Sequence, residues 1–177
     1  MKKAIDLISF YNDIEGIVKN RPIDARHLIL YIHLYTEHYI NLICESKKIR
    51  GKNLREKCEK LLQIGSLTQK AFNLIKLIIK LRNKLVHSLT ITLQEVDKEL
   101  DKMDFLFHTT EPDLVWVLNS ADKWQRLHIF SVSLITILYT IACDVYKIKP
   151  RYTIRPEVYI HKIKKPTWKM VLLKKNE

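Results

Sequence analysis

Apolar residues recur every three to four positions along most of this chain, which is the spacing that gathers them on one face of a helix. Residues that favour helix N-termini precede three of the segments, namely Asn53, Thr68, and Thr92 with Glu95 as a capping box, and Gly65 follows one segment as a stop signal. The pattern predicts an all-α fold, an antiparallel bundle of five or six helices with short connections. The predicted helices cover about residues 3–18, 25–46, 53–63, 69–88, 92–107 and 121–146.

The pattern changes after Pro150. The segments Val158–Ile163 and Trp168–Leu173 are short and apolar, and they stand on either side of a Lys-Lys-Pro break, so they could form two strands. We therefore expect residues 1–146 to form the helical bundle and residues 147–177 to form a basic C-terminal extension.

One predicted helix contains the apolar run Leu127–Cys143, whose length is at the lower limit for crossing a membrane. The run includes His128, two Ser and two Thr, and a central helix of a bundle shows the same pattern because it is buried on all sides. We expect a buried core helix and no membrane. A membrane-associated helical protein remains a further, less favoured interpretation of this segment and the basic tail.

The composition favours a helical protein of one domain plus a tail. The chain has 177 residues and only 3 glycines, too few turn formers for an all-β fold. Its three cysteines are an odd count without a CxxC motif, which indicates a reduced, cytoplasmic protein without a disulfide framework or a zinc site. We expect no signal peptide, because Asp6 interrupts the first apolar run.

Positive charge is in excess and is concentrated at the C-terminus. The net charge is +12, and residues 147–177 hold ten Lys or Arg against two Glu. Such an excess favours nucleic acid or an anionic membrane as a partner, although a lysine-rich surface of a soluble protein gives the same balance. We expect the tail to raise the affinity for RNA without selecting a sequence.

The stretch Leu81–His87 (LRNKLVH) is the candidate for chemistry. On a helix, Asn83 and His87 form an i, i+4 pair on one face, and Arg82 stands at the edge of the same sector with a side chain long enough to reach across. Beside them runs a second apolar stripe, distinct from the one that would face the bundle core. Such a face suits contact with a second copy of the chain, because burying a guanidinium inside a monomer is costly unless it is paired. The second stripe consists of Phe72, Ile75, Ile79 and Val86.

The segment Arg82–His87 resembles the R-N-x-x-x-H signature of HEPN domains, and residues 1–146 loosely resemble their helical bundle. These small domains occur in toxin–antitoxin modules, abortive-infection systems and CRISPR-associated ribonucleases. The resemblance implies a homodimer in which two such helices form one basic cleft for RNA. It also implies that Arg82, Asn83 and His87 are the catalytic residues and that neither a cofactor nor a metal is needed.

This chemistry is physically reasonable, because RNA supplies its own nucleophile in the 2′-hydroxyl group. An imidazole exchanges protons near neutral pH, which is the role expected of His87. The Arg82 guanidinium can hold the scissile phosphate by two hydrogen bonds that strengthen in the transition state, and Asn83 could orient His87 or bind a phosphate oxygen. The toxins paired with a nucleotidyltransferase antitoxin usually carry Tyr two residues after the His, and Leu89 at that position argues against this subfamily.

The sequence therefore predicts a HEPN-like, metal-independent endoribonuclease of a defence or toxin–antitoxin system, with an antitoxin or another protein as a further partner. The second interpretation is a catalytically inactive HEPN-like module that binds RNA or a protein. In either case we expect Lys80 and Lys84 to contact RNA, since they share the helix with the motif.

Other histidines carry weaker signals. His33 and Glu37 have the i, i+4 spacing of a metal pair, but no third ligand stands at a suitable spacing. The favoured interpretation is that they are polar positions on a half-exposed helix, and the other is that Glu37 or His33 faces the cleft beside Arg82. We expect His128 to be a core or groove histidine with its hydrogen bonds satisfied.

Overall fold

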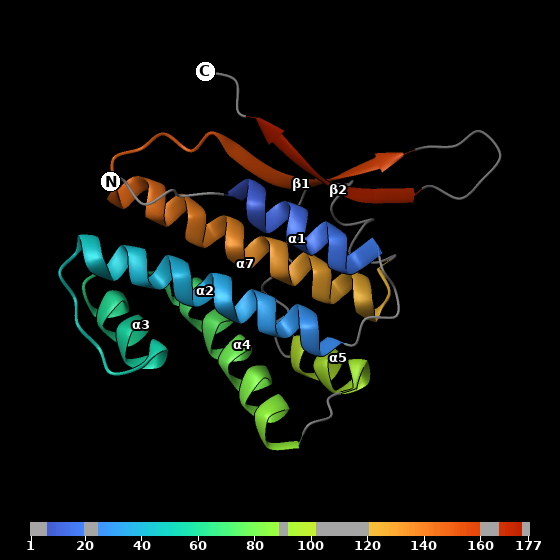
Figure 1. Ribbon diagram of the computed structural model, residues 1–177, viewed down its shortest axis with the longest axis horizontal. Helices are drawn as coiled ribbons and strands as arrows, with labels where there is room; N and C mark the ends of the chain where they lie inside the picture. The colour runs from blue at the N-terminus through green and yellow to red at the C-terminus, as the bar shows by residue number, and fades with distance from the viewer. Residues whose placement is uncertain (1–6, 20–24, 89–91, 102–120, 160–166, 175–177) are drawn as a thin grey trace.

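The structure is a computed structural model that describes residues 7–19, 25–88, 92–101, 121–159 and 167–174. In this part of the chain six helices form a bundle, and a two-stranded sheet packs on it, which confirms the predicted all-α bundle with short strands in the tail (Figure 1). The elements are α1 (Leu7–Lys19), α2 (Ala25–Ser46), α3 (Leu54–Gln63), α4 (Gln69–Ser88), α5 (Leu93–Asp101), α7 (Lys123–Val145), β1 (Tyr152–Tyr159) and β2 (Thr167–Lys174).

The predicted helix-capping residues are confirmed. Backbone N–H groups donate to the side-chain oxygens of Asn53, Thr68 and Thr92 at 2.9, 3.2 and 3.2 Å. Glu95 completes the predicted capping box by accepting a hydrogen bond of 2.9 Å from the N–H of Thr92. Gly65 ends the turn after α3 with a φ of 70°, a left-handed conformation that glycine adopts without strain. Local sequence signals therefore set the ends of α3, α4 and α5.

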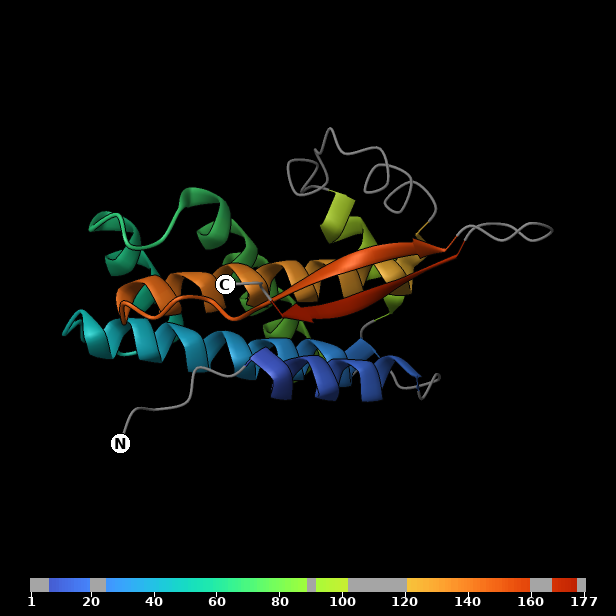
Figure 2. The ribbon, with the colours of Figure 1, turned by 90° about the horizontal axis from the view of Figure 1, so that it is seen from above.

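The long helices α2 and α7 lie side by side through the middle of the molecule (Figures 1 and 2). They run in the same direction, whereas α1 returns antiparallel to α2, and α4 crosses below α2 at a steep angle. Rings of Phe10, Tyr39 and Phe130 are fully buried or nearly so between these helices. The core thus lies along α2 and α7, and α4 leaves one of its faces at the surface.

Helix α7 is the buried helix that the apolar run predicts. The segment Gln125–Val145 is long and apolar enough to cross a membrane, and 61% of its apolar 18-residue window is buried inside the molecule. A core helix meets the same criteria, so the segment alone is weak evidence for a membrane span.

The two strands are antiparallel, but the first begins earlier than predicted. β1 starts at Tyr152 rather than Val158 and pairs Tyr152 with Lys174 of β2. Pro156 lies in the middle of β1. From the sequence alone this proline argues against a strand at that position, because proline has no N–H to donate. In a two-stranded sheet each strand has a free edge, so that missing donor is tolerated there. The predicted end of the strand at Ile163 lies outside the described residues, as does the predicted end of α5 near residue 107.

The hairpin of β1 and β2 packs against α1 and α7. The side chains of Ile154 and Met170 are buried, and the hydroxyl of Tyr11 donates a hydrogen bond of 3.1 Å to the backbone carbonyl of Met170. The hydroxyl of Tyr139 accepts a hydrogen bond of 3.0 Å from the N–H of Arg151. The described part of the tail is therefore attached to the bundle by both apolar and polar contacts.

Candidate nucleic-acid interface

Helix α4 carries the R-N-x-x-x-H motif in its second half and buries one face in the bundle. The predicted core stripe is buried, with Leu81 and Leu85 at 0% and 6% exposure. The second apolar stripe is divided. Phe72 and Ile75 are also buried within the same bundle, whereas Ile79 is only partly buried and Val86 is 52% exposed. The stripe is therefore not one continuous surface for a second copy of the chain.

An open groove of about 540 Å³ follows the exposed face of α4. Asn83 and His87 both line it, as their i, i+4 spacing predicts, and so do the two lysines of the predicted RNA contact. From the first to the last lining residue, the helix is about 16 Å long. The lining residues are Lys76, Ile79, Lys80, Asn83, Lys84 and His87 of α4, together with Arg55 of α3.

Arg82 lies beside this groove and is not part of its lining. The Arg82 side chain is half-buried, and its Nη1 donates a hydrogen bond of 3.2 Å to Oδ1 of Asn83. Arg82 also acts on α2: burial lowers the pKa of His33, the Glu37 carboxylate opposes that shift, and the Arg82 guanidinium adds to the lowering. Arg82 therefore lies close enough to His33 of α2 to act on it, and neither His33 nor Glu37 lines the groove.

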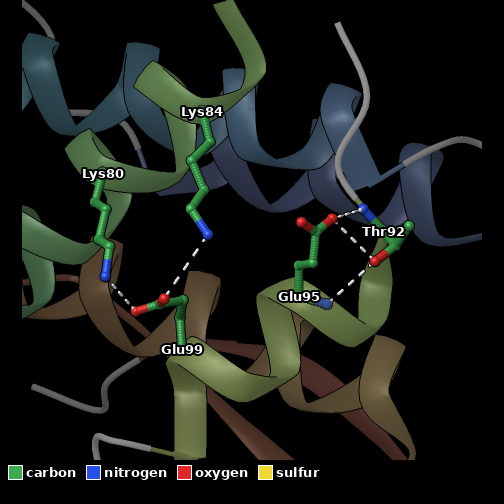
Figure 3. A network of polar contacts seen from close by, with 5 residues as sticks. All are labelled: Lys80, Lys84, Thr92, Glu95 and Glu99. Carbon is green, nitrogen blue, oxygen red and sulfur yellow. Dashed lines mark hydrogen bonds and ion pairs between the residues drawn. The ribbon is translucent and has the colours of Figure 1, made fainter. Parts of the chain in front are cut away.

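Two lysines of the groove are held by one carboxylate of α5. Nζ of Lys80 lies 2.7 Å from one oxygen of Glu99, and Nζ of Lys84 lies 3.8 Å from the other (Figure 3). The Glu99 side chain is only 11% exposed, whereas the lysines are 51% and 42% exposed. The ammonium groups are thus accessible from the groove, and the acid that partly neutralises them is enclosed.

Helix α5 is fixed from its other side by α7. The guanidinium of Arg126 lies 2.8 Å from Asp97 and 2.7 Å from Asp101, and Val96 and Leu100 of α5 are buried. Because α5 is held by ion pairs to both α4 and α7, the position of Glu99 beside the groove is determined by the fold.

His87 is exposed at one end of the groove. Among the described residues, no hydrogen bond or ion pair of its imidazole fixes the ring, so in a single chain its orientation is not set by neighbours. Within the same described ranges, no group of three or more His, Cys, Asp or Glu is arranged to hold a metal ion. The three cysteines are buried and free, and burial raises the pKa of Cys58 to about 12.

His128 is buried in α7, as expected, but its hydrogen bonds are not satisfied as predicted. Its Nε2 has no hydrogen-bond partner in the part of the chain that the structure describes, and Oε1 of Glu15 is 3.7 Å away. Burial lowers the pKa of His128 to about 4 despite this carboxylate, because the charged form is poorly solvated.

Acid is expected to destabilise the fold through His128. The unfolded chain binds a proton at this imidazole below about pH 6.5, and the folded chain does so only below about pH 4. The contribution of neutral His128 to the free energy of unfolding is fully present above about pH 6.5. It falls by about 3 kcal/mol as the pH drops to 4. Urea unfolding at pH 7 and pH 4.5 should show a smaller difference for His128→Gln than for the parent protein. The exposed-site variant His27→Gln should keep the full difference, and parallel behaviour of all three would contradict this role.

Sequence reasoning missed three residues of this site: Lys76, Arg55 and Glu99. Lys76 could have been found, because it lies on the same helical face as Lys80 and Asn83 at positions i, i+4 and i+7. Arg55 and Glu99 come from other helices, and no spacing along the chain places them beside α4.

No family model, curated protein or solved structure matches this chain. The groove and the motif therefore supply the grounds for assigning a function.

Proposed function

We propose that this protein is a HEPN-like, metal-independent endoribonuclease that acts in the cytoplasm as a homodimer, in a defence or toxin–antitoxin system. The observation that carries the proposal is the groove, in which Asn83 and His87 share one surface with Lys76, Lys80 and Lys84. A motif that served only the core would be buried, whereas Asn83 and His87 face solvent among cations. Cations along a groove attract the phosphates of a nucleic acid.

The proposed reaction needs only groups that RNA and this chain supply. The 2′-oxygen attacks the adjacent phosphorus, the bond from phosphorus to the 5′-oxygen breaks, and a 2′,3′-cyclic phosphate forms. His87 exchanges the proton between the attacking and leaving oxygens, and Arg82 stabilises the additional negative charge on the phosphate. The hydrogen bond from Arg82 to Asn83 links the guanidinium to the groove.

A second copy of the chain would complete this site. Arg82 lies off the groove, and the described neighbours leave the His87 ring unoriented, so a single chain does not aim both groups at one phosphate. Exposed apolar side chains lie on α2 and at the end of α4, with Leu34 at 60% and Val86 at 52% exposure. Exposed apolar residues favour a contact between protein surfaces.

The alternative is a catalytically inactive HEPN-like module that binds RNA or a protein. The exposed, unoriented imidazole of His87 favours it, because a base that is not positioned contributes little to catalysis, while the groove cations bind an anion in either case.

The test is cleavage of a labelled single-stranded RNA by the purified full chain in EDTA. We expect cleavage to persist in EDTA, to leave a 2′,3′-cyclic phosphate or its hydrolysis product, and to be absent for a strand with 2′-deoxyribose at the cut site. Activity that requires a divalent metal, or cleavage of the 2′-deoxy strand, would exclude 2′-hydroxyl attack and leave the binding module as the better assignment.

A further inference from the structure

The ion pairs of Glu99 place an anion between two cations at the edge of the groove. One carboxylate oxygen lies 2.7 Å from Nζ of Lys80 and the other 3.8 Å from Nζ of Lys84 (Figure 3). A phosphate group can bind the same two ammonium groups, since two of its oxygens also accept charge-assisted hydrogen bonds. Glu99 therefore uses, in the free protein, the two cations that a phosphate of a bound strand would use.

We propose that the α4 groove binds the phosphate backbone of a single-stranded RNA and that Glu99 competes with the phosphate for Lys80 and Lys84, thereby limiting the affinity of the groove. This inference rests on the proposed function for its ligand, RNA, and adds the path of the strand and a residue that regulates binding. An acidic protein surface is the competing occupant, and the test below separates the two.

The groove lining favours a single strand. Ile79 and the aliphatic stems of the lysines give the groove apolar contact surface between its charged groups. An unpaired base can pack against such a surface, whereas the bases of a duplex are stacked inside and leave only backbone to touch. A peptide of acidic residues alone would pair with the cations and would leave Ile79 without an apolar contact.

Glu99 is the acid best placed to oppose RNA. Arg55 at the other side of the groove is paired with Glu59 at 2.8 Å, but both side chains are well exposed, at 69% and 42%. Water screens such a pair strongly, whereas the Glu99 side chain is 11% exposed and its charge is screened less. Removing the Glu99 charge should therefore change the groove more than removing any exposed acid.

The test is binding of a fluorescent single-stranded RNA with 2′-O-methyl groups, which cannot be cleaved by 2′-hydroxyl attack, measured by anisotropy from 50 to 300 mM salt. Glu99→Gln should tighten binding roughly fivefold at 0.1 M salt and steepen the slope of log affinity against log salt by about 0.7. Lys76→Gln should have the opposite effect, roughly fivefold weaker binding with a slope shallower by about 0.7.

The controls make the same charge changes outside the groove. Asp144→Asn and Lys47→Gln alter exposed residues that do not line it, and their slopes should stay within error of the parent. Two results would overturn the proposal: an equal response of Asp144→Asn and Glu99→Gln, or weaker binding by a Glu99→Gln protein whose thermal unfolding is unchanged. Should Glu99→Gln reduce stability, its salt slope is measured below the temperature at which that variant unfolds. The Lys76→Gln and Lys47→Gln pair then decides independently whether the strand follows the groove, because both lysines are exposed.

Failure of the groove and failure of the ribonuclease assignment give different results. If Glu99→Gln and Lys76→Gln respond as expected but natural RNA is not cleaved, the groove proposal holds and the enzyme assignment fails. If RNA is cleaved but Lys76→Gln matches Lys47→Gln in slope, the strand follows another path. Unchanged RNA binding in Lys76→Gln together with loss of binding to a polyglutamate probe would assign the groove to an acidic protein and overturn the proposal.

Discussion

His87→Ala is expected to lower the rate of RNA cleavage by about 100-fold or more, the scale of losing one general acid–base group. His87 is exposed, so its loss should leave the urea midpoint of unfolding unchanged. His38→Ala removes another exposed histidine, on α2, and should retain full activity. Full activity of His87→Ala would remove the proposed mechanism and favour the inactive binding module.

Arg82, the second proposed catalytic residue, allows a more specific version of the same experiment. Arg82→Ala should cost a similar factor, and Arg82→Lys should also be poor, because one ammonium does not replace two parallel N–H donors. The double variant with His87→Ala should lose less than the product of the two factors, since both groups serve one transition state. Asn83→Ala should cost less than either, because it orients a group rather than supplying one.

Leu34→Glu is expected to convert a dimer into a monomer. Leu34 is 60% exposed in the single chain, on the face of α2 that also carries Leu30 at 43% exposure. A carboxylate there is harmless in a monomer and unfavourable when a second copy covers it, because the charge loses its water. Light scattering at micromolar concentration should therefore show a dimer for the parent and a monomer for the variant, with similar stability.

Ile64→Glu is the matched control for this change. Ile64 follows α3 and is 55% exposed, similar to Leu34. The substitution introduces the same charge, so the Ile64→Glu protein should remain dimeric. A parent protein that is monomeric at micromolar concentration would contradict the shared site. Ile79→Glu would be a less suitable probe of dimerisation, because Ile79 lines the groove and lies against the core.

The helices could be predicted because the signals for them are local. Asn53 and Thr68 cap the helices that follow them, and hydrogen bonds within one turn are enough to do so. Asn83 and His87 share a face for the same reason, since helical spacing alone fixes it.

The remaining features depend on which elements meet in space. A helical projection places Phe72 and Ile75 on a second stripe but cannot show that the same bundle covers them. Glu99 reaches Lys80 across 19 positions of sequence through the placement of α5, which no local pattern encodes. The early start of β1 was not predicted because Pro156 normally argues against a strand. A strand with a free edge tolerates proline, since the missing N–H donor is not needed there.

The hydrogen bond from Tyr11 to the carbonyl of Met170 joins positions 159 residues apart. A chain is synthesised from its N-terminus at about 5–20 residues per second, so α1 leaves the ribosome many seconds before the strand that covers it. Until then the carbonyl of Met170 is not available to the Tyr11 hydroxyl, and α1 lacks the cover of the hairpin. The finished surface of the bundle therefore exists only after residue 170 has emerged, so the first helix waits for the strand that covers it.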